Sequence, residues 1–236
     1  MIEFHKTVVF IGSIVLLITF IASLMNWRKI SNEKALNIFF VVPFIGILSS
    51  VNSLLTSVFN VYDYQLAGLI ERFLVMLDLF YWIYFFSCLG IKVTNKKIFE
   101  RLIAFITPLI FILVSLNHID NKFHHYTISF FYFIEITFCF IYIKNVFVNP
   151  PKQILKKNPI FLIVTGLLIR CAVAIPTHMA SEIMYVGKHL DEYLFIFPLT
   201  NIAIIIMHFH FIYAFTCMKN FDLERRHSRN KMQEMV

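Results

Sequence analysis

Seven long apolar segments constrain the fold of this 236-residue chain more than any other feature. A helix of about 20 residues crosses the hydrocarbon core of a bilayer, and most of these segments approach that length. The pattern therefore predicts an all-α polytopic membrane protein with seven transmembrane helices. We place the segments at about 7–25, 38–60, 70–91, 102–117, 128–148, 159–179 and 194–218.

The composition indicates lipid rather than water as the main solvent. Hydrophobic residues make up 59% of the chain and charged residues 15%, whereas soluble domains carry about 25% charged residues. The net charge of +7 does not indicate nucleic-acid binding, because the basic residues are confined to short loops and the C-terminal tail. The four cysteines lie in apolar segments without CxxC spacing, which predicts neither disulfides nor a zinc site.

The distribution of Lys and Arg predicts the orientation in the membrane. With seven spans, sixteen basic residues fall on one side and four on the other. Because cytoplasmic loops carry the excess, the N-terminus is expected outside and the C-terminus in the cytoplasm of a bacterial cell (inner) membrane. Residues 1–218 form the transmembrane domain, and residues 219–236 form a basic tail that we expect to be helical. The tail is either an anchor on the inner leaflet or a signalling helix.

Arg170 interrupts the sixth apolar segment, where a charge needs a partner or a water-filled cavity. Other polar residues lie at a similar depth in four further segments. At 1.5 Å per residue, all of them fall roughly 10–13 Å below the outer ends of their helices. This predicts a polar layer in the outer half of the membrane, formed by Asn52, Asp78, Glu135, Arg170, Thr200 and Asn201.

An arginine between two carboxylates can be satisfied, because one guanidinium can serve both. The spare negative charge is then balanced by a cationic ligand, a bound proton or a protonated carboxyl group. The layer is either a structural network that holds the helices in register or the floor of a small-molecule pocket, and we favour the pocket. Its predicted ligand-binding residues are Asn52, Asp78, Tyr81, Trp82, Glu135, Arg170, Thr200 and Asn201. Tyr84, Phe131, Tyr132 and Phe197 are expected to complete the walls. No catalytic residue, metal ligand or cofactor is predicted.

Several other seven-helix classes fit the residues less well. Segment 194–218 contains no lysine for a retinal Schiff base, and the chain shows neither an internal repeat nor a Pro-Gln motif of the sugar-transporter kind. The membrane histidines His178, His208 and His210 are ill-spaced for a zinc amidase. Two alternatives stay open, namely a lipid-acting hydrolase using Asp78 and Glu135 as acid and base, and a transporter or structural subunit of a membrane complex.

Two stretches resemble a known kind of membrane module. Residues 101–118 read RLIAFITPLIFILVSLNH and precede His124, His125 and Tyr126, and residues 158–168, NPIFLIVTGLL, open the sixth segment. With the topology and a tail that resembles a linker helix, they are similar to the seven-transmembrane sensory modules of bacterial histidine kinases and to related stand-alone seven-helix proteins. The resemblance implies a receptor-like sensor. Its expected partners are a small-molecule ligand from the outer side, membrane lipids and a cytoplasmic signalling protein, and no nucleic acid. Its sixth and seventh helices, which contain Pro176 and Pro198, are expected to transmit the signal.

Overall fold

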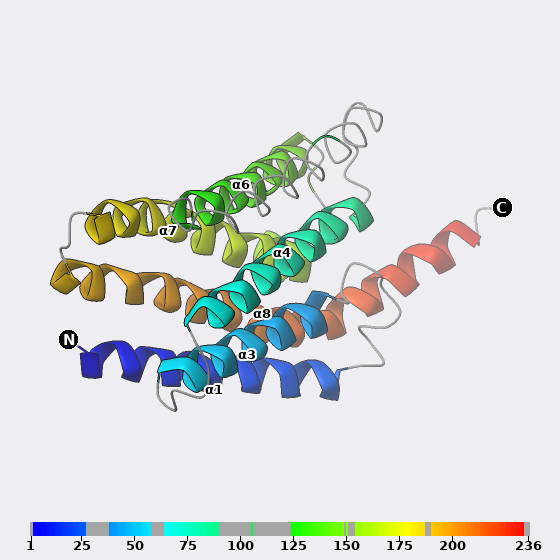
Figure 1. The fold of residues 1–236 in the computed structure, drawn as a ribbon. Helices are drawn as coiled ribbons and strands as arrows, with labels where there is room; N and C mark the ends of the chain where they lie inside the picture. The colour runs from blue at the N-terminus through cyan, green and yellow to red at the C-terminus, as the bar shows by residue number, and fades with distance from the viewer. Residues whose placement is uncertain are drawn as a thin grey trace.

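Six long helices make up almost all of the chain that the computed structural model describes (Figure 1). The structure describes residues 2–26, 38–57, 64–89, 105, 124–148, 150, 154–186 and 190–233, and it contains no strand within them. The all-α fold class is thus confirmed for this part of the chain. The helices are α1 (Ile2–Met25), α3 (Ile38–Ser57), α4 (Tyr64–Cys88), α6 (His124–Val148), α7 (Pro159–Val186) and α8 (Leu190–Gln233), with the short 3-10 helix η3 (Leu155–Lys157) before α7.

Four of these helices are long and apolar enough to cross a membrane. They contain the stretches Thr7–Met25, Ile128–Val148, Pro159–Ser181 and Pro198–Met218. These stretches lie at the first, fifth, sixth and seventh predicted segments.

The remaining predicted segments differ in how far the structure describes them. The second and third correspond to α3 and α4, whose apolar stretches Ile38–Asn52 and Phe73–Cys88 are shorter. The fourth segment, 102–117, lies outside the described residues except for Phe105, which is helical and exposed.

The helices pack into a closed ring in which each helix contacts the next one described along the chain, and α8 returns to α1. The contact between α7 and α8 is the most extensive, and Figure 1 shows these two helices side by side. Aromatic rings from α3, α4 and α8 meet inside this ring. Phe39 and Trp82 both pack against Phe211, with centroid distances of 5.2 and 6.1 Å. Aromatic rings therefore fill this part of the interior.

Helices α4 and α6 run in the same direction. Asp78 on α4 and Tyr132 on α6 both contact Arg170. Further along the same two helices, Phe86 stacks on Phe138 with ring centroids 5.5 Å apart. Increasing residue numbers on one helix therefore match increasing numbers on the other.

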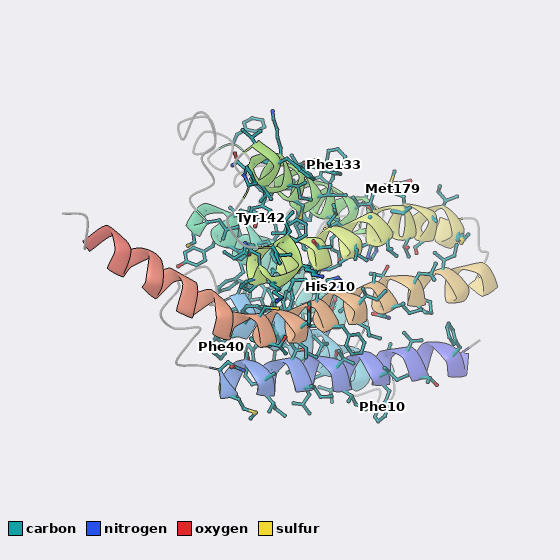
Figure 2. All side chains as sticks on the ribbon, turned by 180° about the vertical axis from the view of Figure 1, so that it is seen from behind. Phe10, Phe40, Phe133, Tyr142, Met179 and His210 are labelled. Atoms are coloured by element: carbon teal, nitrogen blue, oxygen red, sulfur yellow. The ribbon has the colours of Figure 1, made fainter. Side chains whose placement is uncertain are left out.

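The bundle exposes apolar side chains and buries polar ones. Phe10, Phe133 and Met179, labelled in Figure 2, lie on three different helices and are 61%, 60% and 46% exposed. The ionisable side chains of Asp78 and Arg170, by contrast, are buried. Lipid favours this distribution, because apolar surface meets hydrocarbon while polar groups find partners inside. The surface agrees with the four membrane-capable helices in indicating a membrane protein.

Local sequence explains how α7 begins and how closely it packs. Pro159 occupies the first turn, where a helix tolerates the missing N–H, and Oδ1 of Asn158 accepts hydrogen bonds from the backbone N–H groups of Ile160 and Phe161 at 3.0 and 3.2 Å. Two turns after Pro159, Gly166 presents no side chain to α8. A Cβ atom there would lie 3.2 Å from the carbonyl oxygen of Met207. The two backbones therefore approach one another closely.

Candidate functional site

A buried ion pair joins α7 to α4. Nη2 of Arg170 lies 2.6 Å from Oδ2 of Asp78, and each residue is only 6% exposed. A charge-assisted hydrogen bond of this length is among the stronger polar contacts in proteins. The predicted pairing of Arg170 with a carboxylate of the third apolar segment is therefore present.

Tyr132 on α6 adds a second partner for the guanidinium. Its hydroxyl oxygen lies 3.3 Å from Nη2 of Arg170, and its ring centroid lies 4.9 Å from Cζ. An aromatic face at this distance attracts a cation, and the attraction is stronger where water is excluded. The Tyr132 ring also stacks against the His178 ring, with centroids 5.7 Å apart and an interplanar angle of 24°. The guanidinium is thus held between a carboxylate and a fixed aromatic ring.

Glu135 lies next to this pair without joining it. The Cys171 thiol donates a hydrogen bond to Oε2 of Glu135 at 3.4 Å. Among the described residues Arg170 forms an ion pair with Asp78 and none with Glu135. The expectation that one guanidinium serves both carboxylates is therefore not met, because the neighbouring residue on α7 contacts Glu135 instead.

A cavity of about 100 Å³ opens beside the ion pair. Its polar lining gathers at two places, with Ser49 and Glu71 at one and Asp78, Arg170, Tyr132 and His208 at the other. Apolar side chains from α1, α3, α4 and α8 form the remaining wall. These are Leu16, Val42, Ile45, Leu74, Val75, Ile204 and Met207, together with Gly46. A volume of this size accommodates a few water molecules or one small molecule.

Only some of the predicted polar residues line the cavity. Asp78 and Arg170 line it. Asn52 is buried and contributes a side-chain hydrogen bond to Glu71, which lines the cavity. Thr200 is buried one turn before the lining residue Ile204, and Asn201 is half-buried beside it. Neither Thr200 nor Asn201 belongs to the lining.

Most of the aromatic residues predicted to form the pocket walls do not line the cavity. Tyr132 lines the cavity, but Tyr81 and Tyr84 are 37% and 44% exposed on the outside of the bundle. Trp82 and Phe131 are buried in the core, and Trp82 packs against Phe85 and Phe211. The Phe197 side chain lies outside the described part of the structure. The cavity is therefore bounded mainly by aliphatic side chains.

Three polar lining residues were not among the residues predicted for the pocket, namely Ser49, Glu71 and His208. Oγ of Ser49 on α3 lies 2.9 Å from both carboxylate oxygens of Glu71 on α4. Other hydroxyls, including those of Thr19, Thr165 and Thr177, donate to carbonyl groups of their own helices. Ser49 instead links two helices. The signal in the sequence was the spacing of Glu71 and Asp78, since residues seven apart share one face of a helix.

Several polar atoms near the cavity are buried without a hydrogen-bond partner in the described part of the chain. Three of them belong to lining residues: Oδ1 of Asp78, Nε of Arg170 and Nδ1 of His208. A buried polar atom left unpaired costs about 1–3 kcal/mol. These atoms therefore favour a polar occupant that supplies both donors and acceptors. The described residues include no group of three or more His, Cys, Asp or Glu side chains that could hold a metal ion.

Comparison of the chain with protein-family models, with curated proteins and with solved structures finds no match. The class of the protein therefore rests on its fold and site, a helical bundle with membrane-capable helices around a buried ion pair and a small polar cavity.

Proposed function

We propose that this protein is a multi-pass sensor of the bacterial inner membrane. A small polar ligand binds in the cavity beside Arg170 and Asp78, and α7 and α8 transmit the binding to a cytoplasmic partner.

The observation that carries the proposal is the continuity of α8. Ile204, Met207 and His208 line the cavity, and the same helix continues without a break to Gln233. Its C-terminal part projects beyond the rest of the bundle (Figure 1). With 44 residues, α8 is about 66 Å long, roughly twice the thickness of a hydrocarbon core. A displacement at His208 is therefore carried along a helix to a segment outside the apolar region.

The packing of α7 on α8 supports coupling between the ion pair and this helix. Gly166 lies one turn from Arg170 on α7, and it faces the backbone of Met207 across the interface. Met207 itself lines the cavity. A shift of Arg170 toward or away from a ligand therefore acts on the part of α8 that forms the cavity wall.

The course of the helices supports seven spans. The parallel course of α4 and α6 agrees with the seven-span proposal, in which the predicted apolar segment 102–117, outside the described residues except for Phe105, is the span between them. With seven spans, the excess of basic residues puts the C-terminal end of α8 in the cytoplasm. Arg170 is then near the middle of the span Pro159–Ser181, and Glu71 lies about 10 Å nearer the outer surface than Asp78.

The lipid hydrolase that the sequence left open is the weaker alternative. It requires Asp78 and Glu135 to face one substrate as acid and base. Asp78 lines the cavity and is paired with Arg170, whereas Glu135 contacts Cys171 and does not belong to the lining. No specific observation favours the transporter or the structural-subunit alternative either.

A thermal-shift screen of the purified full chain in detergent tests the proposal. The library consists of small polar molecules that differ in charge. We expect at least one compound to raise the midpoint of unfolding of the wild type and to lose this effect in Asp78→Asn and Arg170→Lys. Glu135→Gln is the matched control, because it also removes a buried carboxylate but one outside the lining. A screen without a hit, or hits that stabilise all variants equally, would overturn the proposal.

A further inference from the structure

The two carboxylates that line the cavity have different partners. Asp78 is paired with the guanidinium of Arg170 at 2.6 Å. Glu71 receives hydrogen bonds from the hydroxyl of Ser49 and the amide of Asn52, both of which are neutral donors. No ion pair of Glu71 is present among the described residues. The guanidinium of Arg170 thus pairs with Asp78 and leaves Glu71 without a cationic partner among the described residues.

From this arrangement we infer that the cavity binds a small primary ammonium ion that also carries a hydroxyl group, with the ammonium at Glu71 and the hydroxyl at Asp78 and Arg170. The inference specifies the ligand class of the sensor and rests on that proposed function. With both carboxylates ionised and His208 neutral, the lining carries a net negative charge, because it contains one guanidinium. A ligand with one positive charge restores neutrality, which matters in a site surrounded by hydrocarbon.

The end of the cavity at Asp78 and Arg170 favours a hydroxyl group on the ligand. Oδ1 of Asp78 accepts hydrogen bonds and Nε of Arg170 donates them, and both are buried without a partner in the described structure. A hydroxyl group can donate to the first and accept from the second at the same time. The unpartnered Nδ1 of the buried residue His208 offers a further contact in the same lining. A second charge on the ligand is not required there, because the ion pair is already neutral.

The wall between the two ends selects a short apolar linker. Leu74 and Val75 lie between Glu71 and Asp78 on α4, and Ile204 and Met207 of α8 belong to the same lining. The α-carbons of Glu71 and Asp78 are about 10 Å apart along the helix axis. The volume of about 100 Å³ limits the ligand to a few heavy atoms. A short amino alcohol meets all of these conditions.

Isothermal titration of the full chain with three probes of similar shape tests the charge. Ethanolamine is the cationic probe, ethylene glycol the neutral one and glycolate the anionic one. We expect ethanolamine to bind at least about tenfold more tightly than either of the others. Propylamine, which lacks the hydroxyl group, is expected to bind more weakly than ethanolamine.

Two isosteric variants locate the cation. Glu71→Gln is expected to weaken ethanolamine binding about tenfold or more, whereas Glu135→Gln, which removes a buried carboxylate outside the cavity, leaves it unchanged. Equal losses in both variants would overturn the assignment to Glu71.

The remaining outcomes separate this inference from the sensor itself. If ethylene glycol or glycolate binds more tightly than ethanolamine, the assignment of a cationic ligand is overturned. A proton that neutralises Glu71 would give this result. The sensor proposal would stand, because the cavity would still bind a ligand. If a library compound other than an amino alcohol stabilises the protein and ethanolamine does not bind, the ligand class is likewise overturned and the sensor proposal stands. Failure of every probe and every library compound overturns both proposals.

Discussion

Glu71 and Asp78 lie two turns apart on one face of α4, and both line the same cavity. The partner of Asp78 is a guanidinium 2.6 Å away, while Ser49 and Asn52 offer Glu71 only neutral donors. One helix face thus presents to the same cavity a carboxylate that is paired with a cation and a carboxylate that is not.

Removing one member of the ion pair is expected to destabilise the bundle more than removing both. Arg170→Met leaves the Asp78 carboxylate buried without its cation, at a cost of about 3–5 kcal/mol. Arg170→Met combined with Asp78→Leu removes both charges and is expected to recover most of this loss. Thermal unfolding of the purified variants measures the difference. An additive double variant, less stable than either single one, would contradict a direct interaction between the two side chains.

The ring of Tyr132 is expected to matter more than its hydroxyl group. Tyr132→Phe keeps the aromatic face near Cζ of Arg170 and loses only a hydrogen bond of 3.3 Å, so we expect a cost of about 1 kcal/mol or less. Tyr132→Leu also removes the cation–π contact and the stacking on His178, and the cost should exceed that of Tyr132→Phe. The midpoints of unfolding of the two variants give the comparison. Equal stabilities would show that the ring does not support the guanidinium.

Close packing of α7 on α8 is expected to make Gly166 intolerant of a larger side chain. A Cβ atom there would lie 3.0 Å from Cβ of His210 and 3.2 Å from the Met207 carbonyl oxygen. Gly166→Val therefore has to separate the helices, with an expected cost of about 1–3 kcal/mol. Gly12→Ala is the control, because its Cβ would lie 3.8 Å from the nearest atom, in Ile205, which is an ordinary contact. Unchanged unfolding of Gly166→Val would contradict the close contact.

Deletion of residues 219–236 is expected to separate binding from signalling. The described lining lies entirely before these residues, so ligand binding and thermal stability should stay close to those of the full chain. Output through the cytoplasmic partner should disappear. Titration with the ligand and a reporter of partner activity measure the two effects in parallel. A truncated protein that still signals would place the output elsewhere.

The helices were largely predictable from the sequence because apolar segments of membrane length have few alternatives. Three of the four membrane-capable stretches begin where the predicted segments begin, at Thr7, Ile128 and Pro159. The ends of the helices were less predictable. Residues 194–218 and the tail were assigned separately, but the structure joins them in one helix from Leu190 to Gln233. Polar tail residues carry no apolar boundary signal that would locate the end of a helix.

The same uncertainty at helix ends explains why Glu71 was missed. The predicted third segment began at residue 70, which placed Glu71 at the membrane surface. In the structure α4 begins at Tyr64, so Glu71 lies two turns inside the helix. Counting from Tyr64 instead of residue 70 adds six residues, or about 9 Å, to the distance of Glu71 from the start of the segment.

The sequence also did not predict which side chains point into the bundle. Tyr81 and Trp82 are adjacent, and neighbouring residues on a helix point about 100° apart. Tyr81 is 37% exposed on the outside, and Trp82 is buried against Phe211. Only the positions of the neighbouring helices decide which residue faces the interior. Arg170 was predictable because a lone charge in an apolar helix has to face a partner.

The most direct test of the sensor is a distance measurement between α6 and α8. Spin labels on cysteines introduced at the exposed positions Lys144 and Thr216, in a protein with Cys88→Ser, report the separation of the two helices by pulsed electron paramagnetic resonance in lipid nanodiscs. The natural cysteines Cys139, Cys171 and Cys217 are buried and can stay. A ligand shown to bind the wild type is expected to shift the distance distribution, and Asp78→Asn is expected to abolish the shift. An unchanged distribution at saturating ligand would contradict the sensor proposal, because binding would then leave α8 where it is.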